Sequence, residues 1–230
     1  MFAKNKIMTI QPGTIRFLKA LSKNNNRDWF KANKAKYDAA LANMKEFVEA
    51  IKEGLNETDN IEKGKIFRIY RDVRFSKNKE PYKNYFGAAF TRATAQLRGG
   101  YYIHIEPSNC FLGGGFWAPN PADLKRIRQE FEMDDQYIRK IISDKKFKKY
   151  FGELRGDAVK TAPKGFSREH PAIDLIRMKQ FTVMRPFSDE AVLKKTFLKE
   201  VKKTFEAMRP YFDYMSEVLT TDLNGESVLN

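Results

Sequence analysis

Three short runs of sequence decide the fold: YFGAAFTRA at residues 85–93, GYYIHIEP at 100–107 and CFLGGGFW at 110–117. Each is rich in aromatic or β-branched residues, and turn-forming residues separate it from the next, which is typical of β-strands. The runs KIFRIYRDVRF at 65–75 and MKQFTVMRPF at 178–187 have the same character. We therefore expect a sheet of about four to five strands, antiparallel or mixed.

Amphipathic helices are expected both before and after the strands in the sequence. Asn26 is a candidate N-cap for a long helix reaching about Leu55, because apolar residues recur there every three or four positions. Asn120 opens another helix, and Ser188 a carboxy-terminal one. The sequence thus predicts an α+β fold with long amino-terminal and carboxy-terminal amphipathic helices. We expect one domain over residues 1–230, with its core at about 12–222.

Composition is compatible with a folded, basic protein. Hydrophobic residues make up 42% of the 230 residues, enough for a core, and 43 Lys and Arg against 29 Asp and Glu give a net charge of +14. That charge attracts nucleic acid, anionic lipid head groups or phosphorylated metabolites, although a solvated lysine surface without a specific partner gives the same net charge. Cys110 is the only cysteine, and no apolar run has the length of a signal peptide or a spanning helix. We expect a cytoplasmic protein without a transmembrane segment.

The densest chemical signal is the segment from Lys63 to Lys83, which holds eight basic residues against Asp72 and Glu80. It either binds a phosphate or carboxylate through charge-assisted hydrogen bonds or forms a structural Arg/Asp network that holds a loop to the sheet. If residues 65–75 are extended, one face is polar and carries Arg68, Tyr70, Asp72 and Arg74, and the other is the core side with Phe67, Ile69, Val73 and Phe75. Arg71 falls among the apolar residues, so it is buried against a carboxylate or the strand bulges there. The candidate ligand-binding residues are Arg68, Arg71, Arg74, Lys79, Tyr82 and Lys83.

A second constellation lies in YYIHIEP, where alternation places Tyr102, His104 and Glu106 on one face. A carboxylate beside an imidazole suits general acid–base chemistry. A histidine whose pairing with the carboxylate is only structural would show the same sequence pattern. The candidate catalytic residues are Asp72, His104 and Glu106. With only two histidines and no recognisable spacing of carboxylate ligands, the sequence predicts no metal site, and it identifies no cofactor.

The order of these motifs resembles the family known as domain of unknown function 2461. The resemblance rests on residues 67–90 and 99–128, on APKGF and REHP, and on MKQF, and it extends from FLKALSKNNNRDWF at 17–30 to the last helices. It implies a single α+β domain in cytoplasmic proteins, and it implies no established reaction or catalytic residue. The positions that match the family pattern are Arg68, Arg71, Asp72, Arg74, Phe75, Lys79, Pro81, Tyr82, Lys83, His104 and Lys179.

Three functions are compatible with these patterns. In the first, a phosphate-bearing small molecule is held by Arg68, Arg74, Lys79 and Lys83 while Asp72, His104 or Glu106 handles protons, which predicts a concave pocket joining both strands. The second is a nucleic-acid binding module without sequence specificity, using the net charge and lysines such as Lys145, Lys146, Lys148 and Lys149. The third is a protein-interaction domain without catalysis, which predicts a flat apolar patch. The sequence assigns no reaction, so it leaves open whether the protein is an enzyme.

Overall fold

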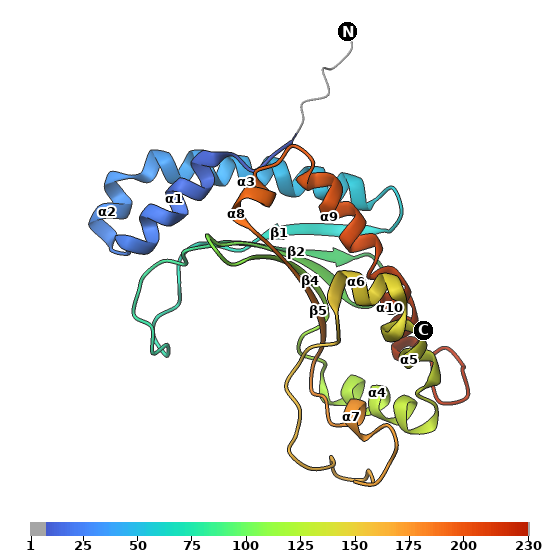
Figure 1. Cartoon of the computed structure of the whole chain (residues 1–230). Coiled ribbons are helices and arrows are strands. Elements are labelled where there is room, and N and C mark those ends of the chain that lie inside the picture. The colour runs from blue at the N-terminus through green and yellow to red at the C-terminus, as the bar shows by residue number, and fades with distance from the viewer. Residues whose placement is uncertain (1–7, 230) are drawn as a thin grey trace. The chain divides into compact units, whose positions relative to one another are not determined.

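The computed structural model describes residues 8–229 and has an α+β fold built on one five-stranded antiparallel sheet (Figure 1). The strand order in the sheet is the order in the chain, β1-β2-β3-β4-β5. The strands are β1 (Ile61–Ile66), β2 (Phe86–Arg92), β3 (Gly100–Ile105), β4 (Cys110–Phe116) and β5 (Phe181–Phe187). The predicted fold class, with helices towards both ends of the chain, is confirmed.

The chain divides into two compact units. Unit 1 takes the chain up to Phe90, together with Tyr102–Leu112 and Pro186–Lys203. Unit 2 consists of Thr91–Tyr101, Gly113–Arg185 and the chain from Thr204 onward. The single domain expected over residues 1–230 stays a prediction. The expectation of no signal peptide rests partly on residues 1–7, and these lie outside the residues that the structure describes.

The first helices of unit 1 are α1 (Pro12–Lys23), α2 (Arg27–Ala32) and α3 (Lys34–Leu55). Asn26 caps α2 by accepting a hydrogen bond from the backbone N–H of Trp29, as its sequence position predicts. The single helix expected from Asn26 to Leu55 is interrupted at Asn33, whose side chain donates to the Trp29 carbonyl. Asparagine breaks helices in this way because its amide competes with the backbone for hydrogen bonds. Beyond the break, α3 packs on α1 and β1.

The carboxy-terminal helix expected from Ser188 is also divided. It forms α8 (Asp189–Val192), which Ser188 caps, then α9 (Phe197–Glu206) and α10 (Arg209–Thr220), where Pro210 occupies the first turn. Proline is tolerated in a first turn but not within a helix, so a new helix begins there.

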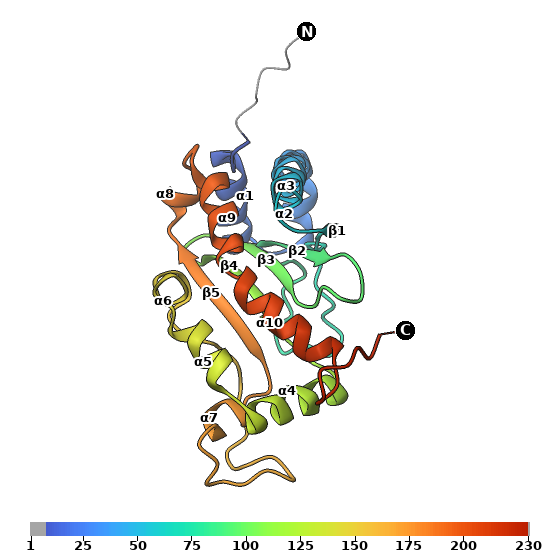
Figure 2. The same ribbon diagram turned by 90° about the vertical axis from the view of Figure 1, so that its right-hand side faces the viewer.

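Unit 2 also contains α4 (Pro121–Met133), α5 (Gln136–Ser143), α6 (Lys145–Phe151) and α7 (Ile173–Ile176). The predicted cap of α4 is confirmed, since Asn120 accepts from the backbone N–H of Asp123. Figure 2 shows α10 beside β5, where the buried Tyr211 hydroxyl donates to the Phe181 carbonyl at 2.9 Å. Gly115 has φ +118°, and a Cβ there would collide with the same carbonyl. Close approach of another backbone thus explains this glycine.

Within residues 8–229, none of the helices combines the length and the apolar character that crossing a bilayer requires.

Candidate functional site

Residues 67–85 form a long loop between β1 and β2, not the strand expected over residues 65–75 (Figure 1). Its base is closed by an antiparallel bridge between Tyr70 and Tyr82. Beyond the bridge, Ser76 and Asn78 side chains accept hydrogen bonds from backbone N–H groups two residues on. Such local bonds replace a strand ladder with turns. The predicted apolar face is therefore wrong in part: Ile69 is 1% exposed, whereas Phe67 is 38% and Phe75 is 96% exposed.

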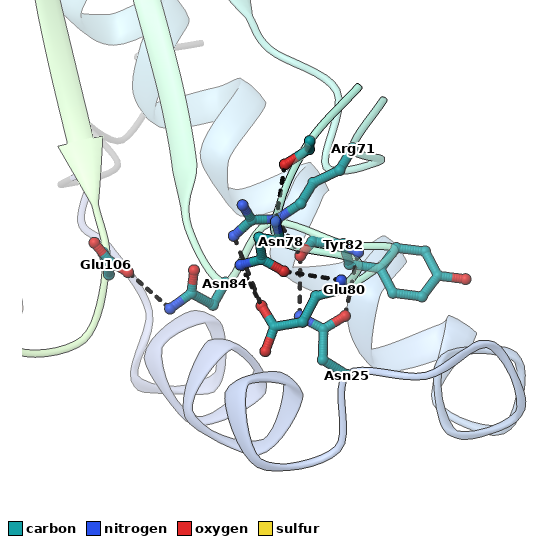
Figure 3. Close-up of polar contacts among 8 residues, drawn as sticks. Asn25, Arg71, Asn78, Glu80, Tyr82, Asn84 and Glu106 are labelled. Atoms are coloured by element: carbon teal, nitrogen blue, oxygen red, sulfur yellow. Dashed lines mark hydrogen bonds and ion pairs between the residues drawn. The ribbon is translucent and has the colours of Figure 1, made fainter. Parts of the chain in front are cut away.

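The base of the loop is held by polar contacts with Asn25, between α1 and α2 (Figure 3), and by ring stacking on Phe30 of α2. Asn25 donates to the Tyr82 carbonyl at 2.9 Å and accepts from the Tyr82 N–H at 3.1 Å. Arg71 Nε donates to the same carbonyl at 2.8 Å, and its guanidinium lies 3.9 Å from Glu80. The Tyr82 ring stacks on Phe30 with centroids 4.0 Å apart. Arg71 is half-buried beside the Glu80 carboxylate, which is close to one of the two arrangements expected for it. Arg71 and Tyr82 both hold the loop in place, and we call this set of contacts the loop clamp.

The tip of the loop carries three more of the candidate residues. Arg74 binds Asp72 in a bidentate pair with contacts of 2.7 and 3.0 Å, and both side chains are exposed. The Arg74 hydrogen bonds lower the pKa of the Asp72 carboxyl, which therefore stays ionised. Lys79 Nζ donates to the Val73 carbonyl at 3.1 Å. These side chains are bonded to one another or to the loop backbone, and the structure shows none of them beside His104.

A continuous hydrogen-bonded row lies along one face of β3, which we call the β3 row: Tyr102, His104 and Glu106. The Tyr102 hydroxyl lies 3.0 Å from His104 Nδ1, and His104 Nε2 lies 3.1 Å from a Glu106 carboxylate oxygen. The alternate residues Tyr101, Ile103 and Ile105 are buried, as the predicted alternation requires. The sequence therefore predicted correctly that these three polar residues share a face.

The direction of the protons along the β3 row follows from its outer partners. Asn84 and Asn109 both donate to Glu106 at 2.7 Å, and Figure 3 shows the contact from Asn84. Both Glu106 oxygens are therefore acceptors, and we assign His104 Nε2–H as a further donor to one of them. The neutral imidazole then has Nδ1 unprotonated, and Nδ1 accepts the Tyr102 O–H.

Burial shifts the pKa values of two side chains in the β3 row. Desolvation lowers the pKa of His104, and the neighbouring Glu106 opposes this without reversing it. His104 is therefore neutral at pH 7. Desolvation also raises the pKa of Tyr102 to about 12, so the phenol is protonated under the same conditions.

Aromatic rings and one glycine fix the position of the row. The His104 ring lies between Tyr85, at 4.2 Å, and Phe111, which stacks on it at 4.6 Å. A Cβ on Gly87 would lie 2.5 Å from the Tyr102 hydroxyl, so only glycine leaves room for that side chain. Asn84, Tyr85, Asn109 and Phe111 were not predicted as site residues. Asn84 and Tyr85 precede β2 and Phe111 lies on β4, so the register of the sheet brings them to the row, whereas Asn109 reaches it from the turn between β3 and β4.

Lys83 connects the basic segment to the β3 row. Its Nζ lies 5.8 Å from the Tyr85 ring centroid and 5.9 Å from that of Phe67. Partial burial, then Arg68 and Arg71, lower the pKa of Lys83. Arg68 is exposed and, among the described residues, donates no hydrogen bond. Lys83 thus lies beside Tyr85, which packs on His104, and the charge of Arg68 acts on both Lys83 and Asp72.

Two cavities lie away from the β3 row. In unit 1 a cavity of about 550 Å³ opens between α1 and α3, beside Arg16, Trp29 and Lys36. In unit 2 a cavity of about 320 Å³ lies beside Tyr137 and Phe147. Within residues 8–229, no group of three or more His, Cys, Asp or Glu side chains is arranged to hold a metal ion.

A comparison with protein families matches residues 13–214 to the model described as "Conserved hypothetical protein (DUF2461)". The chain belongs to this family. The match includes the loop clamp and the β3 row, and the family description names no activity. No curated protein and no solved structure matches the chain.

Proposed function

We propose that this member of the family binds a phosphate-bearing small molecule beside β3, with Lys83 and Arg68 as the cationic contacts. The observation that carries the proposal is the environment of Lys83. The charges that act on its ammonium group are those of Arg68 and Arg71, both positive, and the lysine is partly buried. Like charges gathered at a partly desolvated position repel each other, and a bound anion relieves that repulsion.

The distribution of the other charges supports the same position. Arg74 is neutralised by Asp72, and Arg71 lies beside Glu80, whereas no carboxylate of the described residues pairs with Lys83. The rings of Phe67 and Tyr85 next to Lys83 offer a surface on which a sugar or base attached to the phosphate can stack. The proposed ligand is therefore a phosphorylated sugar or nucleoside and not free phosphate alone.

The test is a thermal-shift titration with nucleotides, sugar phosphates and inorganic phosphate at low and physiological salt. A ligand that binds only the native state stabilises it by RT ln(1 + [L]/Kd), about 2.7 kcal/mol at a hundredfold excess over Kd. We expect a selective shift with one small phosphorylated compound that persists in salt. It should be lost in Lys83→Gln and retained in Lys65→Gln, which removes the same charge from an exposed position on β1.

Equal losses in Lys83→Gln and Lys65→Gln would refute a localised site and indicate general charge attraction. A shift with DNA or RNA alone that disappears as salt rises would favour nucleic-acid binding instead. The four lysines of α6, Lys145, Lys146, Lys148 and Lys149, are exposed and would be the first to replace in that case.

A further inference from the structure

We propose that Tyr102 is a reactive phenol, with His104 as its general base and Glu106 as the residue that positions the base, able to attack electrophilic sulfonyl, acyl or phosphoryl groups. The inference goes beyond ligand binding because it assigns a chemical activity to the β3 row. Its test uses a neutral reagent, so it and the anion site can fail separately.

The order of the three groups supports this role. A hydroxyl that donates to an imidazole, whose other nitrogen donates to a carboxylate, is the arrangement that activates hydroxyl nucleophiles that are protonated at neutral pH. Here the contacts are 3.0 Å from hydroxyl to Nδ1 and 3.1 Å from Nε2 to the carboxylate. Because Nδ1 is the unprotonated nitrogen, it can accept the phenol proton at the moment of attack.

Two further observations fit a reactive group better than a packing contact. His104 is buried, at 7% exposed, whereas Tyr102 is partly exposed, so a reagent in solvent reaches the Tyr102 side chain more readily than its base. Among the described residues the Tyr102 oxygen accepts no hydrogen bond, which leaves its lone pairs available. Glu106 is held by Asn84 and Asn109, so the carboxylate that would stabilise an imidazolium cannot turn away.

The balanced step with a sulfonyl fluoride is a substitution at sulfur. The Tyr102 oxygen forms the O–S bond, the S–F bond breaks, and fluoride leaves. The phenol proton moves to His104 Nδ1, and the imidazolium formed beside Glu106 then releases a proton to solvent. No oxidant or reductant takes part.

The experiment is labelling of the whole chain with benzenesulfonyl fluoride, followed by peptide mapping that gives a rate for each tyrosine. Tyr137 is the internal control, because it is 60% exposed and stacks on another tyrosine, with no histidine contact. At pH 7 we expect Tyr102 to react at least about tenfold faster than Tyr137.

The pH profile separates the two mechanisms. A phenol without a general base reacts through its phenolate, so the rate at such a tyrosine rises steeply from pH 7 to 9. Tyr102 should change little over that range, because its base is already unprotonated. His104→Gln keeps a hydrogen-bond partner but removes the base, so Tyr102 should slow at least about tenfold and acquire the slope of Tyr137. Glu106→Gln should slow Tyr102 while the flat profile remains.

Labelling that follows exposure, with Tyr137 ahead of Tyr102 and equal pH slopes, would overturn the inference in the unmodified protein alone. Retention of the fast rate in a folded His104→Gln protein would do the same. If His104→Gln fails to fold, the wild-type pH profile and Glu106→Gln decide the question. Lys65→Gln, which removes a charge from an exposed position on β1, should leave the Tyr102 rate unchanged.

Discussion

Replacing Arg71 by alanine distinguishes a structural arginine from a ligand contact. The mutation removes one hydrogen bond, from Arg71 Nε to the Tyr82 carbonyl at 2.8 Å, and a guanidinium contact with Glu80 at 3.9 Å. The carbonyl keeps its second donor, Asn25, so no buried acceptor is left unsatisfied. A hydrogen bond of this kind contributes about 1 kcal/mol, and the Glu80 pair adds at most a few tenths because Glu80 is exposed.

We therefore expect Arg71→Ala to lower the free energy of unfolding by about 1 kcal/mol. For a chain of this size that corresponds to a fall of about 2–4 °C in Tm, measured by thermal unfolding and checked by urea titration. The affinity for a phosphorylated ligand should change less than in Arg68→Ala, because the Arg71 guanidinium is engaged with the Tyr82 carbonyl and Glu80.

Arg68→Ala is the matched control and should behave in the opposite way. Arg68 is exposed and without a hydrogen bond among the described residues, so its removal should leave Tm unchanged and weaken ligand binding. The reasoning is refuted if Arg71→Ala abolishes binding at unchanged Tm, since the loop clamp would then be a ligand-binding site.

Two further predictions concern the β3 row. Folding lowers the pKa of His104 below its ordinary value of 6.5, so the unfolded chain binds more protons than the folded chain near that pH. The free energy of unfolding should therefore fall as pH decreases through 6.5 towards the folded pKa. Urea titrations at several pH values should show this dependence, and His104→Gln should reduce it. Gly87→Ala places a Cβ 2.5 Å from the Tyr102 hydroxyl and should cost about 1–3 kcal/mol in urea unfolding. Tyr102→Phe in the same chain should recover part of that loss, and strictly additive effects would show that the two side chains do not collide.

The strands and the β3 row could be predicted because alternation within one strand decides them. Tyr102, His104 and Glu106 must share a face wherever residues 100–106 are extended, irrespective of the neighbouring strands. The loop over residues 67–85 could not be predicted in the same way. Its alternating apolar residues resemble a strand, but Ser76, Asn78 and Pro81 favour turns over a ladder, and that competition is decided by tertiary contacts.

The partners of the row were beyond sequence reasoning for a different reason. Asn84 precedes β2, so its contact with Glu106 depends on the register of the β2–β3 pair, whereas Asn109 reaches Glu106 from three residues away within the turn before β4. A shift of one residue in the β2–β3 pair would turn Asn84 to the other face. The break at Asn33 is similar, because a helix interruption depends on one side-chain hydrogen bond that propensity does not resolve.

The space above Gly87 also constrains how the family can change over evolutionary time. Because a Cβ at position 87 would lie 2.5 Å from the Tyr102 hydroxyl, a lineage that gains a side chain there keeps more of its stability if Tyr102 is also lost or shortened. The two positions should therefore vary together. A homologue that pairs glycine at the first position with tyrosine at the second has kept the room for the β3 row, and one with a larger residue at the first has given it up.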